Sequence, residues 1–109
     1  MASDFSALSS GLSELMVLRL LQRQEMYGYE IVQAIAERTA QVLSPGEGVV
    51  YPLLHALEKS GALKSRRKTV GGRSRIYYSL TARGAKRLAA MADHWSALNG
   101  AVGMVLHAV

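Results

Sequence analysis

The feature that most restricts the fold of this chain is a hairpin signal, Gly71-Gly72, which follows three helix-like segments. Paired glycines supply the positive φ angles that tight hairpin turns need. In the run after these glycines, every second residue is apolar or aromatic. These residues are Ile76, Tyr78 and Leu80, and in a strand they would share one face. That spacing is typical of a strand. The run before them is polar and basic, and its pairing rests on the turn. We therefore predict strands at 63–70 and 75–80, joined through residues 71–74.

Two helices are predicted ahead of the hairpin from their apolar spacing. Residues 12–24 carry leucines around most of a helical circumference. A second segment begins after Gly28 and fades by Thr39. Its apolar stripe is formed by Ile31, Val32, Ile35 and Ala36.

A third helix is predicted from Ser44, because Ser44-Pro45-Gly46-Glu47 has the form of a capping box with Ser44 at the N-cap. Gly61 fits the position just after its C-terminus. Pro52 conflicts with one unbroken helix, since proline removes a backbone donor. We therefore expect a bend or a second start near Gly48.

A final helix is predicted from Ala82, with Thr81 as its N-cap. Its apolar residues step by three and four, which is a heptad seam of about two and a half repeats. No acidic residue, lysine or arginine occurs from residue 95 to 109. Such a helix would expose a large apolar patch on a monomer, so we expect it to be buried against a partner. The expected interface consists of Leu88, Met91, Trp95, Leu98, Val102 and Val105.

Charge is concentrated in one segment. Residues 59–87 hold ten of the 13 lysines and arginines and no acidic residue, whereas the rest of the chain holds three basic residues and all eight acids. A segment of this kind suits nucleic acid or an anionic membrane surface, although a solvated cationic face is the simpler alternative. The apolar stretch 89–109 is interrupted by polar residues and glycines, and the heptad spacing explains it better than a membrane span. We expect no membrane partner.

Several functional classes are unlikely on sequence grounds. The chain has no cysteine, which removes disulfide scaffolds, thiol catalysis and cysteine-ligated metals. Its three histidines form no His-Glu helical pair, and no phosphate-binding glycine motif is present. We expect no enzyme activity and no metal or other cofactor. The first residues lack the features of a secretory leader, so a cytoplasmic protein is expected.

Three helices, a basic hairpin and a last helix are the order of a winged helix-turn-helix, a mainly α (α+β) fold. We predict a winged domain at residues 1–81 and a dimerisation helix at 82–109. Tyr51 and His55 lie opposite the apolar stripe of the third helix and could reach bases, although Tyr51 could instead be packed and His55 merely solvated. Arg73 and Arg75 flank the tip of the wing and suit phosphate or a narrow minor groove.

Five segments resemble the PadR family of bacterial transcriptional regulators. They are Leu15–Leu21, Tyr27-Gly28-Tyr29-Glu30-Ile31, Val50-Tyr51-Pro52-Leu53-Leu54, Leu57–Gly61 and Gly72–Thr81 followed by Gly84. The resemblance runs from about Leu12 to Trp95. It departs from the family pattern at Val49-Val50, where Thr-Leu is usual, and at Ser74-Arg75-Ile76 in the wing.

The resemblance implies a homodimeric repressor that binds a pseudo-palindromic double-stranded DNA operator. The expected DNA-binding residues are Tyr27, Gly48, Val49, Tyr51, His55, Arg66, Arg73 and Arg75. Some small members of the family bind flat aromatic molecules at the dimer centre, between paired tryptophans. A similar effector would here meet Leu88, Met91, Trp95 and Asn99. Trp95 could equally serve only as interface core. The alternative function is a winged helix that contacts proteins and binds no DNA.

Overall fold

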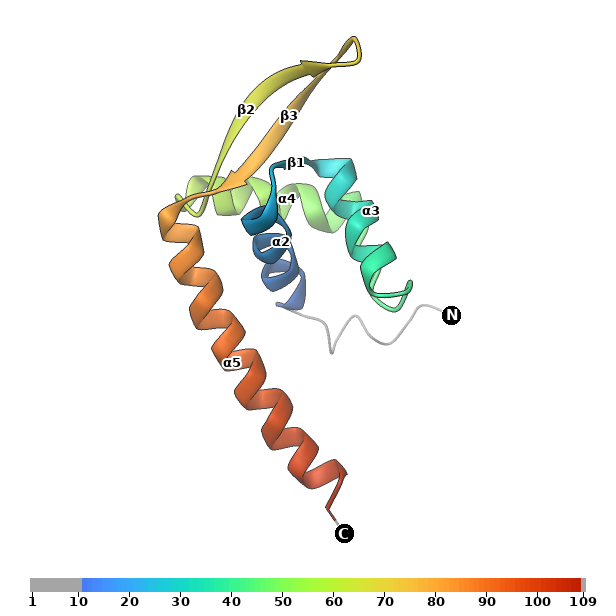
Figure 1. The fold of residues 1–109 in the computed structure, drawn as a ribbon, viewed down its shortest axis with the longest axis vertical. Coiled ribbons are helices and arrows are strands. Elements are labelled where there is room, and N and C mark those ends of the chain that lie inside the picture. The colour runs from blue at the N-terminus through green and yellow to red at the C-terminus, as the bar shows by residue number, and fades with distance from the viewer. Residues whose placement is uncertain (1–10, 109) are drawn as a thin grey trace.

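The computed structural model describes residues 11–108, which form four helices and a small antiparallel sheet (Figure 1). The sheet has the strand order β1-β3-β2. Along the chain the elements are α2 (Leu12–Arg23), β1 (Met26–Tyr27), α3 (Gly28–Arg38), α4 (Glu47–Lys59), β2 (Leu63–Val70), β3 (Arg73–Leu80) and α5 (Ala82–Leu106). This is the predicted winged helix-turn-helix, in which β2 and β3 form the wing and α4 is the recognition helix.

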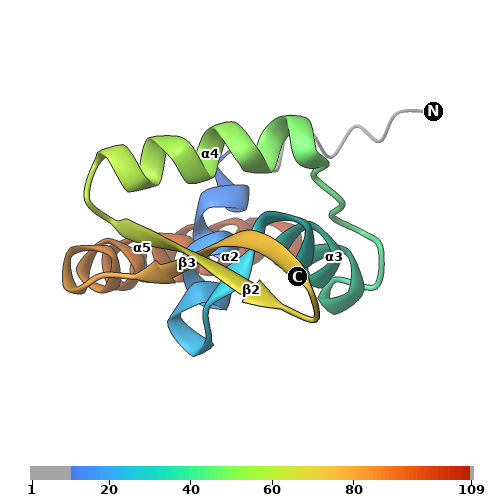
Figure 2. The ribbon, with the colours of Figure 1, turned by 90° about the horizontal axis from the view of Figure 1, so that it is seen from above.

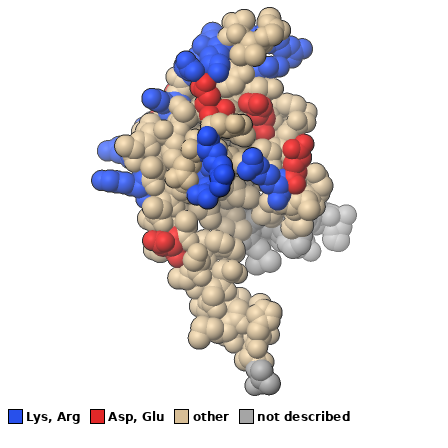
Figure 3. Space-filling model, in the orientation of Figure 1, with Lys and Arg blue, Asp and Glu red and all other residues tan. Residues whose placement is uncertain are grey.

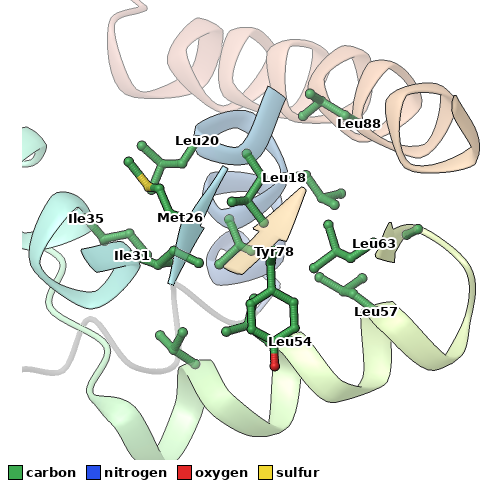
Figure 4. Packing of buried hydrophobic residues seen from close by; sticks show 14 residues of the cluster. Leu18, Leu20, Met26, Ile31, Ile35, Leu54, Leu57, Leu63, Tyr78 and Leu88 are labelled. Carbon is green, nitrogen blue, oxygen red and sulfur yellow. The ribbon is translucent and has the colours of Figure 1, made fainter. Parts of the chain in front are cut away.

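The hydrophobic core lies between α2, α3, α4 and the base of the wing (Figure 4). Leu18, Ile31 and Leu54 are fully buried and come from the three different helices. Tyr78 enters the same cluster from β3. Each helix contributes one apolar stripe, and the three stripes can leave water only by meeting one another. The core therefore fixes the orientation of α4 relative to the wing (Figure 2).

The wing is a β-hairpin whose turn has two residues. Gly71 and Gly72 have φ angles of 60° and 80°, which only glycine adopts readily in succession, and Val70 pairs directly with Arg73. The predicted strands are confirmed, but β3 begins at Arg73 rather than at residue 75. The turn is tighter than expected because the two glycines alone complete the reversal.

The two-residue strand β1 was not predicted. Met26 pairs with Tyr78 and Tyr27 pairs with Tyr77. As a result Tyr77 is buried, although it lies on the face of β3 opposite the core. The Tyr27 ring covers it edge-on, with 5.4 Å between ring centroids.

The prediction that Ser44 caps the recognition helix was wrong. Gly46 is the N-cap and α4 begins at Glu47. The preceding loop is held by Thr39, whose hydroxyl donates to the Leu43 carbonyl (2.9 Å) and accepts from the Leu43 N–H (3.0 Å). The segment that follows Leu43 has no helical conformation before Glu47. Pro52 therefore lies inside a single helix that starts beside Gly48, not after a bend.

The predicted C-terminus of α4 and the predicted N-terminus of α5 are confirmed. Gly61 has φ 87°, and the N–H groups of Gly61 and Ala62 donate to the carbonyls of Glu58 and Leu57, which is a Schellman motif. Thr81 caps α5 by accepting from the Gly84 N–H at 3.0 Å. From there α5 extends past the other labelled elements, and its far end stands away from them (Figure 1). No helix in residues 11–108 has the length and apolar character needed to cross a membrane.

Candidate nucleic-acid interface

The exposed side of α4 carries four of the residues predicted to contact DNA. Gly48, Val49 and His55 are exposed, whereas Tyr51 is half-buried. The Tyr51 ring lies against Gly28 at the start of α3, so it does not project freely as the helical spacing suggested. Burial, with smaller contributions from Glu47 and Tyr27, raises the pKa of the Tyr51 phenol. Tyr51 is therefore a neutral hydroxyl at physiological pH, suited to donate a hydrogen bond.

A hollow of about 430 Å³ connects α4 with the wing and the start of α3. It lies beyond the end of β1, along the edge of β3 that β1 leaves uncovered. Five of the eight predicted DNA-binding residues border it, namely Tyr27, Tyr51, His55, Arg73 and Arg75. The fold thus brings together residues that lie up to 48 positions apart in the sequence.

Arg75 is held in place by stacking. Its guanidinium carbon lies 4.3 Å from the centroid of the Tyr27 ring. Tyr27 packs edge-on against Tyr77, and the Lys68 ammonium lies 4.4 Å from the Tyr77 ring on the other side. Cation–π contacts of this kind restrict a long side chain without neutralising its charge. Arg75 is thereby presented at the hollow with its charge available.

Arg66, another of the eight predicted DNA-binding residues, is situated differently. Its guanidinium donates to Glu25, with Nη2 to Oε1 at 2.7 Å and Nε to Oε2 at 3.2 Å. Lys68 donates to the same Oε1 at 2.7 Å. Sequence spacing could not reveal this cluster, because Glu25 lies 41 and 43 residues from its partners and stands outside the basic segment.

The basic segment is thus only partly free of acidic partners. Arg87 pairs with Glu14 of α2, and Arg83 donates to the Ser60 carbonyl at 3.0 Å. Arg73 and Arg75 form no ion pair within residues 11–108. Lysine and arginine gather over the wing, whereas the far half of α5 carries neither sign of charge (Figure 3). Two cations without an ion pair in this part of the chain, Arg73 and Arg75, therefore lie at the wing tip, beside the hollow.

The seam of α5 divides into two parts. Leu88, predicted at the dimer interface, is only 4% exposed because it is buried in its own subunit's core, so little of its side chain remains for a partner to contact. Met91 also packs on that core. Farther along, the side chains are open to solvent, at 42% for Trp95 and 62% for Leu98. Val102 and Val105 are exposed as well.

A groove of about 620 Å³ runs between α5 and the pair α2 and α3. Of the four residues predicted to meet an aromatic effector, Leu88 and Trp95 border this groove. Met91 and Asn99 are not among the residues that border it. Arg19 and Arg38 stand at the groove among mostly apolar neighbours. Two of the four residues therefore border one groove, and the effector site as a whole stays a prediction.

The family model "Transcriptional regulator PadR-like family" matches residues 17–90, which run from the middle of α2 through the recognition helix and the whole wing into α5. The chain belongs to this family. PadR-like proteins are transcriptional regulators, so the chain is a regulator and not an enzyme.

Individual relatives agree with this assignment. An uncharacterized protein X of Lysinibacillus sphaericus is 32% identical over 81 residues, covering 73% of this chain and 74% of that protein. The transcriptional regulator YqjI of Escherichia coli is 35% identical over 68% of this chain, but the match spans only 34% of YqjI. Larger parts of YqjI therefore have no counterpart in this comparison.

Solved structures match over nearly the whole chain. A PadR family regulator from Eggerthella lenta has 30% identity and a TM-score of 0.81, covering 94% of this chain and 88% of its own. A protein from Streptococcus mutans has 32% identity and a TM-score of 0.83, covering 99% and 95%. Because these matches extend beyond residue 90, the position of α5 is also shared with known folds.

Proposed function

We propose that this regulator binds double-stranded DNA sequence-specifically through α4 and the wing. The observation that carries this proposal is the hollow in which Tyr51 and His55 of the recognition helix face the unpaired Arg73 and Arg75 of the wing. A recognition helix reads base edges in the major groove, while a basic wing grips the neighbouring backbone. Gly48 and Val49, exposed in the first turn of α4, would meet the groove with His55.

The functional unit we propose is a homodimer joined through the far half of α5. Trp95, Leu98, Val102 and Val105 supply an apolar surface that no described residue covers. Two winged domains related by a two-fold axis would address a pseudo-palindromic operator with half-sites about one helical turn apart. In this division of labour residues 1–81 bind DNA and residues 82–109 assemble the dimer.

The direction of regulation and the effector are further parts of the proposal. We propose repression in the cytoplasm, released by a flat aromatic molecule that stacks on Trp95. The partial exposure of Trp95 beside an apolar groove supports the effector site. Titration of Trp95 fluorescence with a planar aromatic cation tests it, since absence of quenching beyond the inner-filter control excludes stacking.

Fluorescence anisotropy tests the DNA proposal directly. The protein is titrated into duplex from the region upstream of its own gene and into random duplex, across roughly 50–200 mM salt. Tighter binding to the upstream duplex, with a steep salt dependence, is the expected result. Equal binding to both duplexes would show only non-specific DNA affinity at that region. No binding at the lowest salt would contradict the proposal and favour a winged helix that contacts proteins.

A further inference from the structure

The two faces of the wing hold different cations. Strand pairing places Lys68 opposite Arg75 and Arg66 opposite Tyr77, so these four residues share one face. Arg67 alternates onto the other face, where its guanidinium donates to Ser74 at 3.3 Å. Glu25, in the connection between α2 and β1, meets only the first face. One carboxylate from outside the basic segment therefore pairs with two of its cations, while the segment has no acidic residue of its own.

The Glu25 contacts have the geometry of a phosphate contact. Both carboxylate oxygens accept from Arg66, and Oε1 accepts from Lys68 as well. Arg66 remains 66% exposed even though it is paired, while the Glu25 side chain is only 25% exposed. Hydrogen bonds from Arg66 and then Lys68 lower the pKa of the Glu25 carboxyl to about 2, so the anion is present at all physiological pH values. The cluster thus combines a fixed anion with a cation that DNA could still reach.

We propose that Glu25 is a specificity-determining residue, whose carboxylate occupies the place of a DNA phosphate on Arg66 and Lys68 and so limits sequence-independent binding by the wing. This inference rests on the proposed DNA-binding function. Phosphate contacts add affinity for every sequence and carry no information about bases. A cation that must leave a carboxylate before it meets a phosphate contributes little to this sequence-independent affinity. Arg73 and Arg75, which have no such partner within residues 11–108, retain their full contribution.

The test compares Glu25→Gln with the intact protein on random duplex DNA. Glutamine keeps the size of the side chain and removes its charge, which frees both cations. Each new phosphate contact steepens the dependence of log K on log salt by about 0.9. The expected steepening is therefore about 0.9–1.8 per subunit, and the loss of affinity between roughly 50 and 200 mM salt grows by about 3- to 12-fold for each subunit that contacts the duplex. An unchanged slope would overturn the proposal.

Glu14→Gln is the matched control. It removes the same single charge and also frees an arginine, Arg87, but this pair joins α2 to α5 and not to the wing. Its slope on random duplex should stay that of the intact protein. An equal steepening in both variants would show that net charge alone is responsible, which also overturns the proposal.

A second variant guards against the possibility that Glu25→Gln disturbs the fold. Arg66→Gln combined with Lys68→Gln should leave the salt slope unchanged, because these cations already have their anion. A shallower slope by about 0.9–1.8 would mean that both contact phosphate in the intact protein, and the proposal would fall.

Heparin separates failure of this inference from failure of the proposed function. Heparin is a polyanion without base sequence, so its binding does not require a DNA regulator. Glu25→Gln should elute from immobilised heparin at higher salt than Glu14→Gln even if neither binds an operator. Co-elution of the two variants would overturn the role of Glu25, whereas loss of DNA binding with a retained difference on heparin would contradict only the DNA proposal.

Discussion

The Tyr51 ring of the recognition helix lies so close to Gly28 that a Cβ atom at residue 28 would stand 2.2 Å from Cε1 of the tyrosine. Gly28 is also the first residue of α3, and it is buried. The contact joins the beginning of α3 to the middle of α4, the two helices of the helix-turn-helix. The absence of a side chain at residue 28 therefore sets how closely these helices approach each other.

Gly28→Ala should destabilise the fold and displace the recognition helix. The new methyl group needs space that the Tyr51 ring fills, and overpacking of this kind typically costs about 1–3 kcal/mol. We expect a lower free energy of unfolding in urea than for the intact protein. We also expect the affinity for specific DNA to fall by more than the affinity for random DNA. Trimming the ring by Tyr51→Ala in the same chain should recover part of the lost stability, which a double-mutant cycle measures.

Gly48→Ala is the control for stability. It lies in the first turn of α4, and a Cβ there would meet nothing within 4 Å. The same substitution should therefore stabilise the protein by up to about 1 kcal/mol, because alanine restricts the unfolded chain. Equal effects of the two substitutions on the free energy of unfolding would show that the Gly28 contact is not tight in solution.

Tyr51 and Arg73 should affect DNA binding in different ways. Arg73 lies at the wing tip without an acidic partner in the described residues, so Arg73→Ala should weaken binding to every duplex and reduce the salt slope by about 1 per subunit. Tyr51→Ala alters the surface of the recognition helix and should change which sequence is preferred. Anisotropy on operator and random duplexes distinguishes them. Equal losses on both duplexes for both variants would disprove this division of roles.

The sequence predicted those parts of the fold that depend on neighbouring residues. The Gly71-Gly72 turn, the Gly61 terminus of α4 and the Thr81 cap of α5 are each decided within a few residues, and all are present. The N-terminus of α4 was misplaced because another local interaction, the pair of hydrogen bonds between Thr39 and Leu43, holds the loop just ahead of the Ser44 motif. Side-chain to backbone bonds of this kind compete with helical ones, and the capping-box pattern does not take them into account.

The other features that the sequence missed depend on long-range contacts. Strand β1 has two residues, too few for any alternation, and exists because Tyr77 and Tyr78 lie beside it some 50 residues later. The heptad spacing of α5 correctly marked an apolar face but could not show that α2 covers its first part, which is why Leu88 was assigned to a partner. The types of residue in the candidate site could be predicted from the sequence, whereas the Glu25 cluster is seen only in the folded structure.

Acid should disrupt the link between Glu25 and the wing only at very low pH. The pKa of the Glu25 carboxyl falls from an ordinary 4.5 to about 2 in the folded protein, mainly through its hydrogen bond from Arg66. The folded state therefore favours the anion, so this stabilising contribution is present above about pH 4.5 and is lost as the pH falls toward 2. Carboxyl carbon chemical shifts measured by NMR should place the Glu25 titration near 2. In Arg66→Gln combined with Lys68→Gln it should move up toward 4.5, and a midpoint unchanged by these substitutions would contradict the assigned cause.

Dimer formation should depend on the uncovered half of α5. Leu98 is 62% exposed and lies in the heptad seam, so in the proposed dimer Leu98→Glu would bury an unpaired charge in each subunit. Uncompensated buried charge costs about 3–5 kcal/mol, which predicts a dimer dissociation constant raised at least about 100-fold. Sedimentation equilibrium should then detect monomers, and operator affinity should fall because the two half-sites are no longer bound together.

Ala97→Glu adds the same charge one residue away, outside the seam, where the side chain is exposed and does not border the groove. This variant should remain dimeric and bind DNA like the intact protein apart from a small effect of its charge. Loss of the dimer in both variants would indicate a broader interface around α5. A stable dimer of Leu98→Glu would place the interface on another surface, and the groove between α5 and the pair α2 and α3 would be the first one to test by substitution.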